Sequence, residues 1–338
     1  MKKAVITGER RAEVIDVPAP EPKEDWAVVK VHAAPMCTEY KGFAAGQKSD
    51  FLGHEAAGEV VAVAQPGRVK VGDRVVVMPQ YPCGKCALCI AGDYIYCENN
   101  YDFAEFIGGQ EGRATMAQYV LKPSWLLPPI PDAVSYEHGS LACCALGPSF
   151  GAFQAMGVSA FDTILITGAG PVGLGGIVNA RFRGARVIVA EPVPWRAARA
   201  KDLGAASVID PREPDCLKQI KELTGGDGVG CALDCAGTAE AERLCIDAAR
   251  RKGRVAFVGE CGDPLTIRVS PDLLRKGLTV VGSWHYNLND FSSIMKVIQE
   301  SPLIGLLISH VLPMSGIQEA LELSASHETA KIILKPWE

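Results

Sequence analysis

Short apolar runs separated by glycine and proline dominate the first half of the chain, and they predict strands rather than long helices. Val28–Val31, Val60–Val63 and Val75–Val77 are such runs, because β-branched residues between turn formers are typical of strands. Residues 1–7 carry two lysines and only a very short apolar stretch. They therefore predict a first strand rather than a signal peptide.

From about residue 160 the pattern changes to short apolar strands that alternate with helical stretches. The strands are expected at Thr163–Thr167, Arg186–Ala190, Ser207–Ile209, Cys231–Asp234, Arg254–Val258 and Leu278–Gly282. This alternation predicts a parallel, doubly wound sheet. Two helices, at about 289–300 and 315–324, and a last strand at 331–334 are expected to follow.

The composition predicts a large apolar core and no basic surface. The chain has 338 residues, 48% hydrophobic and 22% charged, and a net charge of −5. About two domains are expected, and neither nucleic acid nor an acidic membrane is an expected partner. Residues 163–180 form an apolar run of nearly bilayer length, but six glycine or proline residues within it predict a turn instead of a membrane span.

Twelve cysteines are present, and four of them are clustered. In a chain without a secretion signal, clustered cysteines indicate metal binding rather than disulfides, and a cytoplasmic location. The cluster is Cys83, Cys86, Cys89 and Cys97, with the spacing C-x2-C-x2-C-x7-C. Four thiolates from one loop can complete a tetrahedral shell around a structural zinc ion. An iron–sulfur cluster or a redox relay is the alternative.

A glycine-rich segment directly follows the first strand of the second half. It reads Gly168-Ala169-Gly170-Pro171-Val172-Gly173, the pattern G-x-G-x-x-G. The first glycine permits a tight turn, the second lets a pyrophosphate approach the backbone, and the third lets the next helix pack closely. The N–H groups at the start of that helix are then expected to bind phosphate. A glycine-rich turn in another kind of α/β domain is the alternative.

An acidic residue, Glu191, ends the next predicted strand. It lies at the distance of about twenty residues expected for a group that binds the adenosine ribose. Because a carboxylate there repels a 2′-phosphate, NAD is expected rather than NADP. Arg196 and Arg199 follow shortly after, and they either offset that repulsion or form a solvated helix face.

The combination of Gly53-His54-Glu55, the four-cysteine loop and the glycine-rich fingerprint resembles the zinc-containing medium-chain dehydrogenase/reductases along essentially the whole chain. Residues 278–284 and the ending 331–336 most resemble the polyol (sorbitol-type) and threonine dehydrogenases of this family. The resemblance implies an α/β fold with a GroES-like β-rich catalytic domain at 1–150 and 286–338. A Rossmann domain, with its doubly wound parallel sheet, is implied at 151–285.

The resemblance also implies a catalytic zinc, and hence two zinc ions per subunit. Its ligands carry over to Cys37, His54 and Cys144, or to Cys143 if the register slips by one. Polyol-type members have a glutamate at the third position, whereas other alcohol dehydrogenases have a cysteine. The fourth position is left to water, to a substrate oxygen or to Glu55, which in the family lies behind the metal and can swing into coordination.

The match departs from the family at the proton relay. The family usually reads Cys-x-Ser/Thr-Asp, whereas this chain reads Cys37-Thr38-Glu39-Tyr40. Either Glu39 accepts the substrate proton as a carboxylate base, or Thr38 does so through a shifted backbone. Glu39 could also bind a second substrate hydroxyl, or merely pair with Lys41 or a ribose.

Around the nicotinamide the resemblance implies contacts from two short segments. They are Val258-Gly259-Glu260 and Ser283-Trp284-His285. Glu260 and His285 either face the ring or the substrate, or lie in solvent-facing loops.

The expected function is transfer of a hydride between a polar secondary alcohol, such as a polyol or sugar, and NAD. The expected substrate is thus a small alcohol or ketone, and a homodimer or homotetramer is expected. A reductase of simpler alcohols and aldehydes is an alternative that Cys144 would suit. A cofactor-binding protein without catalysis is an alternative of another class, since the altered relay is what a decaying active site would have.

Overall fold

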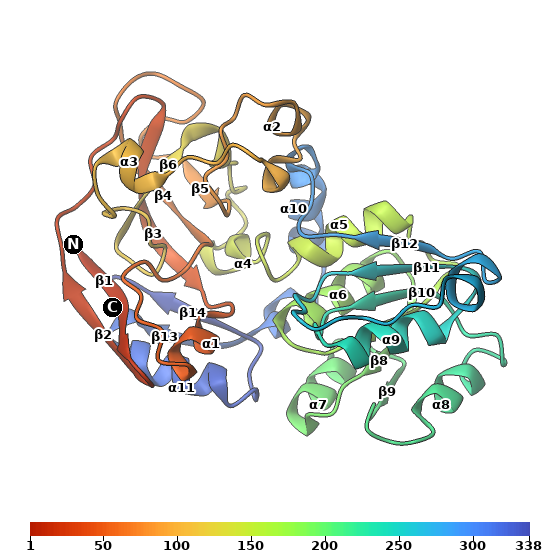
Figure 1. The fold of residues 1–338 in the computed structure, drawn as a ribbon. Coiled ribbons are helices and arrows are strands. Elements are labelled where there is room, and N and C mark those ends of the chain that lie inside the picture. Colours follow the sequence, from red (N-terminus) through yellow and green to blue (C-terminus); the bar gives the residue numbers. More distant parts are fainter. The chain divides into compact units, whose positions relative to one another are not determined.

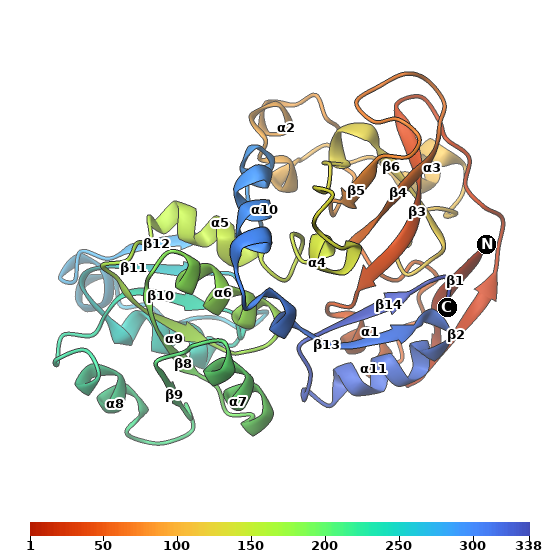
Figure 2. The ribbon, with the colours of Figure 1, turned by 180° about the vertical axis from the view of Figure 1, so that it is seen from behind.

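The computed structural model describes all 338 residues and divides them into two compact units (Figures 1 and 2). Unit 1 comprises Met1–Cys144, Asn287–Glu300 and Ile308–Glu338, and unit 2 comprises Ala145–Tyr286 and Ser301–Leu307. None of the helices has the length and apolar character that crossing a bilayer requires.

Unit 2 contains a six-stranded sheet in which every strand pairs in parallel with its neighbours. In spatial order its strands are β12 (Thr279–Gly282), β11 (Ala249–Phe257), β10 (Val229–Asp234), β7 (Thr163–Thr167), β8 (Arg186–Ala190) and β9 (Ser207–Ile209). The strand order reverses between β7 and β10, which defines the topological switch point of a doubly wound sheet. All six strands expected from the sequence are present, so the predicted Rossmann architecture is confirmed.

Helices cover both faces of this sheet. They are α5 (Gly147–Met156), α6 (Pro171–Phe182), α7 (Pro194–Asp202), α8 (Cys216–Glu222) and α9 (Ala239–Ala248). In Figure 1, α5 and α6 lie on one side of β10 and β11, and α9 lies on the other. Every residue of β10 is consequently buried, as is usual for a central parallel strand. The apolar run at 163–180 forms β7, the turn and most of α6.

Unit 1 is built mainly on antiparallel strands, and the strands expected at 28–31, 60–63 and 75–77 are present in it. Its larger sheet has the order β13 (Ile308–Pro313), β14 (Lys331–Lys335), β3 (Trp26–Pro35), β4 (Ala56–Val63) and β5 (Arg74–Val77), with β6 (Tyr119–Pro123) also paired to β3. Only β13 and β14 pair in parallel. A separate hairpin joins β1 (Lys2–Gly8) to β2 (Arg11–Asp16). The GroES-like fold expected for this part is confirmed.

The helices of unit 1 are mostly short. They are α1 (Glu39–Ala44), α2 (Ala87–Ala91), α3 (Phe103–Ile107), α4 (Tyr136–Ser140), α10 (Phe291–Glu300) and α11 (Ile317–Ala325). Single helical turns occur in both units, at Tyr94–Tyr96, Ser124–Leu126, Val269–Leu274, Leu288–Asp290, Ile304–Leu307 and Met314–Gly316. Helix α11 packs on β2 and β14 and buries Ile317 and Leu321 against the apolar face of the sheet.

Candidate metal and cofactor sites

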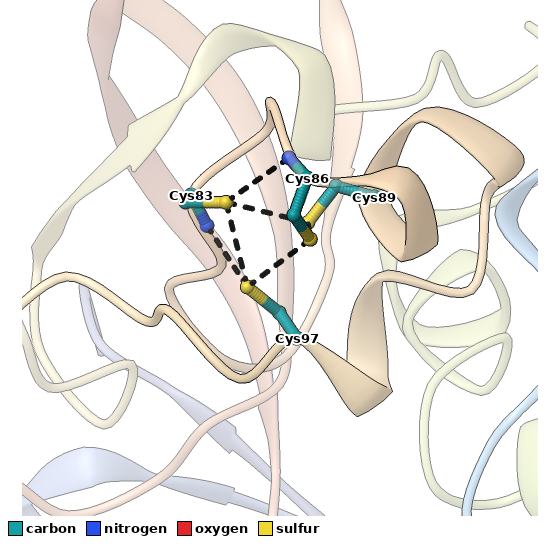
Figure 3. Close-up of side chains that lie close together, drawn as sticks. All are labelled: Cys83, Cys86, Cys89 and Cys97. Atoms are coloured by element: carbon teal, nitrogen blue, oxygen red, sulfur yellow. Dashed lines mark hydrogen bonds between the residues drawn. The ribbon is translucent and has the colours of Figure 1, made fainter.

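The four clustered cysteines converge in the loop after β5 (Figure 3). Neighbouring sulfur atoms lie 3.5 Å (Cys86–Cys89), 3.6 Å (Cys97–Cys83), 3.9 Å (Cys86–Cys97) and 4.0 Å (Cys83–Cys89) apart. A zinc ion with four sulfur ligands at about 2.3 Å requires tetrahedral edges of about 3.8 Å. The sulfur positions therefore fit a closed tetrathiolate zinc site.

The local backbone explains how this loop gathers its thiols. Cys86 is the N-cap of α2, and Gly92 ends that helix in the left-handed conformation with φ of 90°. Partial burial opposes the thiolate of Cys83, but the N–H groups of Lys85 and Cys86 bond to it and lower its pKa to about 6. The thiolate, which is the form that binds zinc, is thus favoured at Cys83, whereas burial and the hydrogen bond with Cys86 raise the pKa of Cys89.

A second set of potential metal ligands lies elsewhere in unit 1. The donor atoms of Cys37, His54, Glu55 and Cys144 all lie within 4.8 Å of one another. Cys37 follows β3, His54 and Glu55 immediately precede β4, and Cys144 follows α4. The Nε2 atom of His54 lies 3.2 Å from the Cys144 sulfur. Two thiols and an imidazole at this spacing fit the donor set of a catalytic zinc site.

Gly53 is needed to bring His54 into this set. Its φ is +82°, and a side-chain carbon there would meet the Thr115 hydroxyl at 2.4 Å and the Met116 nitrogen at 3.0 Å. Any other residue would force the chain away from residues 115–116. The glycine of Gly-His-Glu is thus explained by local packing.

The two adjacent cysteines at 143 and 144 point in different directions. The Cys143 thiol is fully buried and donates to the Val77 carbonyl at 3.5 Å. Cys144 lies beside His54 instead. The geometry therefore favours Cys144 over Cys143 as the third ligand.

The carboxylate of Glu39 lies against two of these potential ligands. The Cys37 N–H donates to its Oε2 at 2.7 Å, and its Oε1 lies 3.4 Å from His54 Nδ1. Thr38, in contrast, is exposed and its hydroxyl does not cap α1. The ring of Tyr40 lies edge-on to that of His327, with 5.4 Å between the centroids.

The carboxylate of Glu55 is held from two sides. Its Oε2 accepts the Cys144 N–H at 3.0 Å, and its Oε1 pairs with the ammonium group of Lys331 on β14. Lys331 also donates to the Met36 carbonyl at 3.0 Å. Lys331 was not identified from the sequence as a site residue. The available signal was a lysine that begins the apolar strand Lys-Ile-Ile-Leu.

These contacts shift the ionisation of the whole set. The hydrogen bond from Cys144 lowers the pKa of Cys37 well below its usual value, despite burial. Burial opposes the charged form of His54, but hydrogen bonds to Cys37 and Glu39 raise its pKa. The thiolate, which is the form that binds zinc, is thus favoured at Cys37.

The glycine-rich fingerprint in unit 2 has the geometry expected of it. Gly168 has φ of +80°, and a side-chain carbon at Gly173 would lie 1.9 Å from the Gly168 carbonyl oxygen. At Gly170 the nearest atoms to such a carbon belong to the Arg196 guanidinium, at 3.8 Å or more. Helix α6 then begins with Pro171 and Val172. The turn is thus tight at its ends and open at Gly170, where a phosphate would approach.

The other residues expected to bind the cofactor lie at the same edge of the sheet. The last residues of five strands are in register, namely Thr167, Ala190, Asp234, Phe257 and Gly282. Gly168, Glu191, Val258 and Ser283 come directly after four of them. This is the carboxyl edge, where doubly wound sheets bind ligands.

Glu191 connects two of these turns. It is 4% exposed, and its carboxylate accepts the N–H of Ala169 at 2.5 Å and that of Val193 at 2.8 Å. Glu191 therefore stabilises the glycine-rich turn through Ala169, and it also lies where the ribose of the cofactor is expected to bind. Ser283 is buried, whereas Trp284 is 46% exposed.

Asp234 is a second buried acid that the sequence did not single out. Its carboxylate accepts hydrogen bonds from Thr167 Oγ1 at 2.8 Å and from the N–H groups of Ala236 and Gly237. Its carbonyl accepts the N–H groups of Val258 and Gly259. Asp234 thus holds the ends of β7, β10 and β11 together behind the fingerprint.

Two family models match the chain. The alcohol dehydrogenase GroES-like domain matches residues 23–132, and the zinc-binding dehydrogenase domain matches residues 171–300. The L-threonine 3-dehydrogenase of Pyrococcus horikoshii is 32% identical over 336 residues, which cover 95% of this chain and 94% of that protein. The sorbitol dehydrogenase of Bacillus subtilis is 34% identical over 269 residues, which cover 77% and 75% respectively.

A solved structure has the same fold. The alcohol dehydrogenase TADH from Thermus sp. ATN1 superimposes with a TM-score of 0.90 at 26% sequence identity, with 99% of each chain covered.

Proposed function

Because this chain belongs to the zinc-containing medium-chain dehydrogenase/reductases, we propose that it transfers a hydride between a polar secondary alcohol and NAD. The observation that carries the proposal is the convergence of Cys37, His54 and Cys144 in unit 1. A nucleotide fingerprint with an open central glycine, in unit 2, supports it. We further propose that the two units correspond to a catalytic domain at 1–150 and 286–338 and a cofactor domain at 151–285.

In this proposal Cys37, His54 and Cys144 hold the catalytic zinc, and the four clustered cysteines hold the structural zinc. Bound at the first site, zinc would lower the pKa of a substrate hydroxyl or polarise a carbonyl. Thr38 and Glu39 directly follow Cys37 in the chain, and Thr38 is the exposed member of the pair. The Glu39 carboxylate can accept the hydroxyl proton as a base, whereas the Thr38 hydroxyl can only relay that proton onward to another acceptor.

A polar substrate is favoured by the names of the relatives, which include threonine and sorbitol dehydrogenases. The experiment is a panel of polyols, sugars and amino alcohols, with simple primary alcohols as comparison, assayed with NAD by NADH absorbance. We expect at least one polar secondary alcohol to exceed the simple alcohols in kcat/KM. A preference for simple alcohols would favour the alternative function, a reductase of simple alcohols and aldehydes, which the cysteine ligand Cys144 suits. No turnover with both zinc ions bound would favour a non-catalytic role.

Glu191 is expected to determine the preference for NAD. Its buried carboxylate would repel a 2′-phosphate. In Glu191→Ala, kcat/KM with NAD divided by kcat/KM with NADP should therefore fall by about 10-fold or more, which corresponds to a loss of about 1.4 kcal/mol in discrimination. The same substitution removes the acceptor of the Ala169 N–H. Because this hydrogen bond stabilises the turn that is expected to bind the pyrophosphate, KM for NAD should rise as well. Wild-type activity that is equal or higher with NADP would indicate that Arg196 and Arg199 dominate instead.

We also propose that the protein is located in the cytoplasm. Two thiol-rich zinc sites require reduced cysteines, which a reducing compartment maintains.

We propose in addition that the protein is a homo-oligomer. Strand β12 is an edge strand on which Val280 is 36% exposed, and Val269 and Leu274, which precede it in the chain, are 64% and 71% exposed. Large exposed apolar patches mark sites of interaction with other molecules, and size-exclusion chromatography with light scattering would measure the subunit count.

A further inference from the structure

We propose that the buried side chain of Lys122 closes the base of the four-cysteine loop in its uncharged form, and that uptake of a proton by Lys122 loosens this loop and the zinc ion in it. The inference rests on the proposed function, because that function assigns a structural zinc ion to the loop. Lys122 lies on β6, outside the loop, and belongs to neither set of potential metal ligands.

The base of the loop is the place where its two ends meet. Tyr81 precedes Cys83 by two residues, and Tyr101 follows Cys97 by four. The N–H of Tyr101 donates to the carbonyl of Tyr81 at 2.8 Å. The Tyr81 hydroxyl also donates to the Arg113 carbonyl at 2.9 Å. A displacement of Tyr81 would therefore release both ends of the loop.

The side-chain nitrogen of Lys122 contacts the two residues that lead into this base. It donates to the carbonyl of Gln80 at 2.5 Å and lies 3.9 Å from the centre of the Tyr81 ring. Gln80 has a φ of +65°, a left-handed conformation that a residue other than glycine keeps only when its surroundings hold it. Lys122 therefore fixes both Gln80 and Tyr81.

No anion accompanies Lys122 in its buried position. The side chain belongs to a residue that is only 2% exposed. The titratable groups that face it are the Tyr81 hydroxyl and the Cys143 thiol. Burial raises the pKa of both, so neither carries a negative charge near neutral pH. Burial consequently lowers the pKa of Lys122 to about 7, and above that pH its amine donates to Gln80 without a buried charge.

The direction of the pH dependence follows from this burial. When the base opens, Lys122 reaches water and its pKa returns toward the usual value of about 10.4. The open loop then binds a proton that the closed loop has released, so the closed loop gains stability as the pH rises from about 7 toward 10. Below about pH 7 Lys122 is charged in both states, and this contribution is absent.

The test measures opening of the loop in the full-length zinc-loaded protein. A chelator and excess N-ethylmaleimide are added, and mass spectrometry follows labelling of the peptide that contains Cys83–Cys97. Lys122→Met keeps an unbranched side chain that neither donates nor titrates. Lys70→Met is the matched control, because Lys70 is an exposed lysine of the same unit. The rate of each variant is divided by the wild-type rate at the same pH, which cancels the pH dependence of the thiol chemistry.

At pH 9 we expect the loop of Lys122→Met to be labelled about 10-fold faster than that of the wild type, because the Gln80 carbonyl has lost its donor. This ratio should fall by about 10-fold or more between pH 9 and pH 7, since each pH unit in this range changes the wild-type opening equilibrium by up to about 10-fold. For Lys70→Met the ratio should stay near one. A ratio for Lys122→Met that is the same at both pH values would overturn the inference.

A measurement on the wild type alone covers the case in which Lys122→Met does not fold. In protein with ¹³C-labelled lysine, one Cε signal should titrate near pH 7, while those of exposed lysines titrate above about pH 10. The absence of such a signal would also overturn the inference. Immediate labelling of the wild-type loop without chelator would instead contradict the structural zinc site of the proposed function.

Discussion

Replacing Cys89 by serine is expected to reduce the zinc content from two ions per subunit to one and to destabilise the segment from Cys83 to Cys97. The Cys89 sulfur lies 3.5 Å from that of Cys86 and 4.0 Å from that of Cys83, so it supplies one corner of the tetrahedron. Zinc binds such sites in small peptides with an apparent free energy of about 10–16 kcal/mol near neutral pH. Because a serine hydroxyl is a poor ligand for zinc, most of that contribution to folding should be lost.

The measurement is metal analysis combined with hydrogen exchange of the backbone amides in this segment. Exchange should accelerate there by several orders of magnitude, while the amides of β10 in unit 2 stay protected. Cys261→Ser is the control, since Cys261 lies in unit 2 and only donates weakly to the Asp263 carbonyl. Two zinc ions retained in Cys89→Ser would refute the assignment of this loop as a metal site.

The sequence predicted best what depends on short-range pattern. The six parallel strands, the turn at Gly168 and the convergence of the four cysteines all follow from residues that are close together in the chain, and the family assignment follows from them. Strands β2, β6 and β13 were not predicted. Strands β2 and β13 are partly exposed throughout and so lack a clear apolar period, whereas β6 is a short, mostly buried strand of five residues. The correspondence of Cys37, His54 and Cys144 with the zinc ligands of the family predicted that these three residues would lie close together.

What the sequence could not provide was the partner of each polar side chain. From the sequence, Glu39 could contact the reacting substrate hydroxyl, a second substrate hydroxyl, Lys41 or a ribose. The fold instead places its carboxylate next to His54 and the Cys37 N–H. Glu191 was expected to face a ribose, but the fold also places it against the Ala169 N–H. Lys331 is 276 residues from Glu55 in the chain, and no local pattern predicts a pairing over that distance.

The pairing of Lys331 with Glu55 leads to the second large effect. Both side chains are almost completely buried, at 1% and 0% exposure. Lys331→Met keeps the length of the side chain and removes the charge, which leaves the Glu55 carboxylate buried without its counterion. Removing one partner of a buried ion pair typically costs about 3–5 kcal/mol, so we expect the free energy of unfolding of unit 1 to fall by that amount.

Because a chain with two compact units need not unfold in one step, hydrogen exchange of the β3, β4 and β14 amides is the appropriate measurement. The double variant Lys331→Met/Glu55→Gln should recover most of the loss, because it removes the uncompensated charge while the glutamine oxygen can still accept the Cys144 N–H. Glu55→Gln alone should also be destabilising, because it leaves the buried Lys331 ammonium group without its counterion. A Lys331→Met cost below about 1 kcal/mol, a size typical of exposed pairs, would mean that Lys331 does not stabilise Glu55. The carboxylate would then be held by the Cys144 N–H alone.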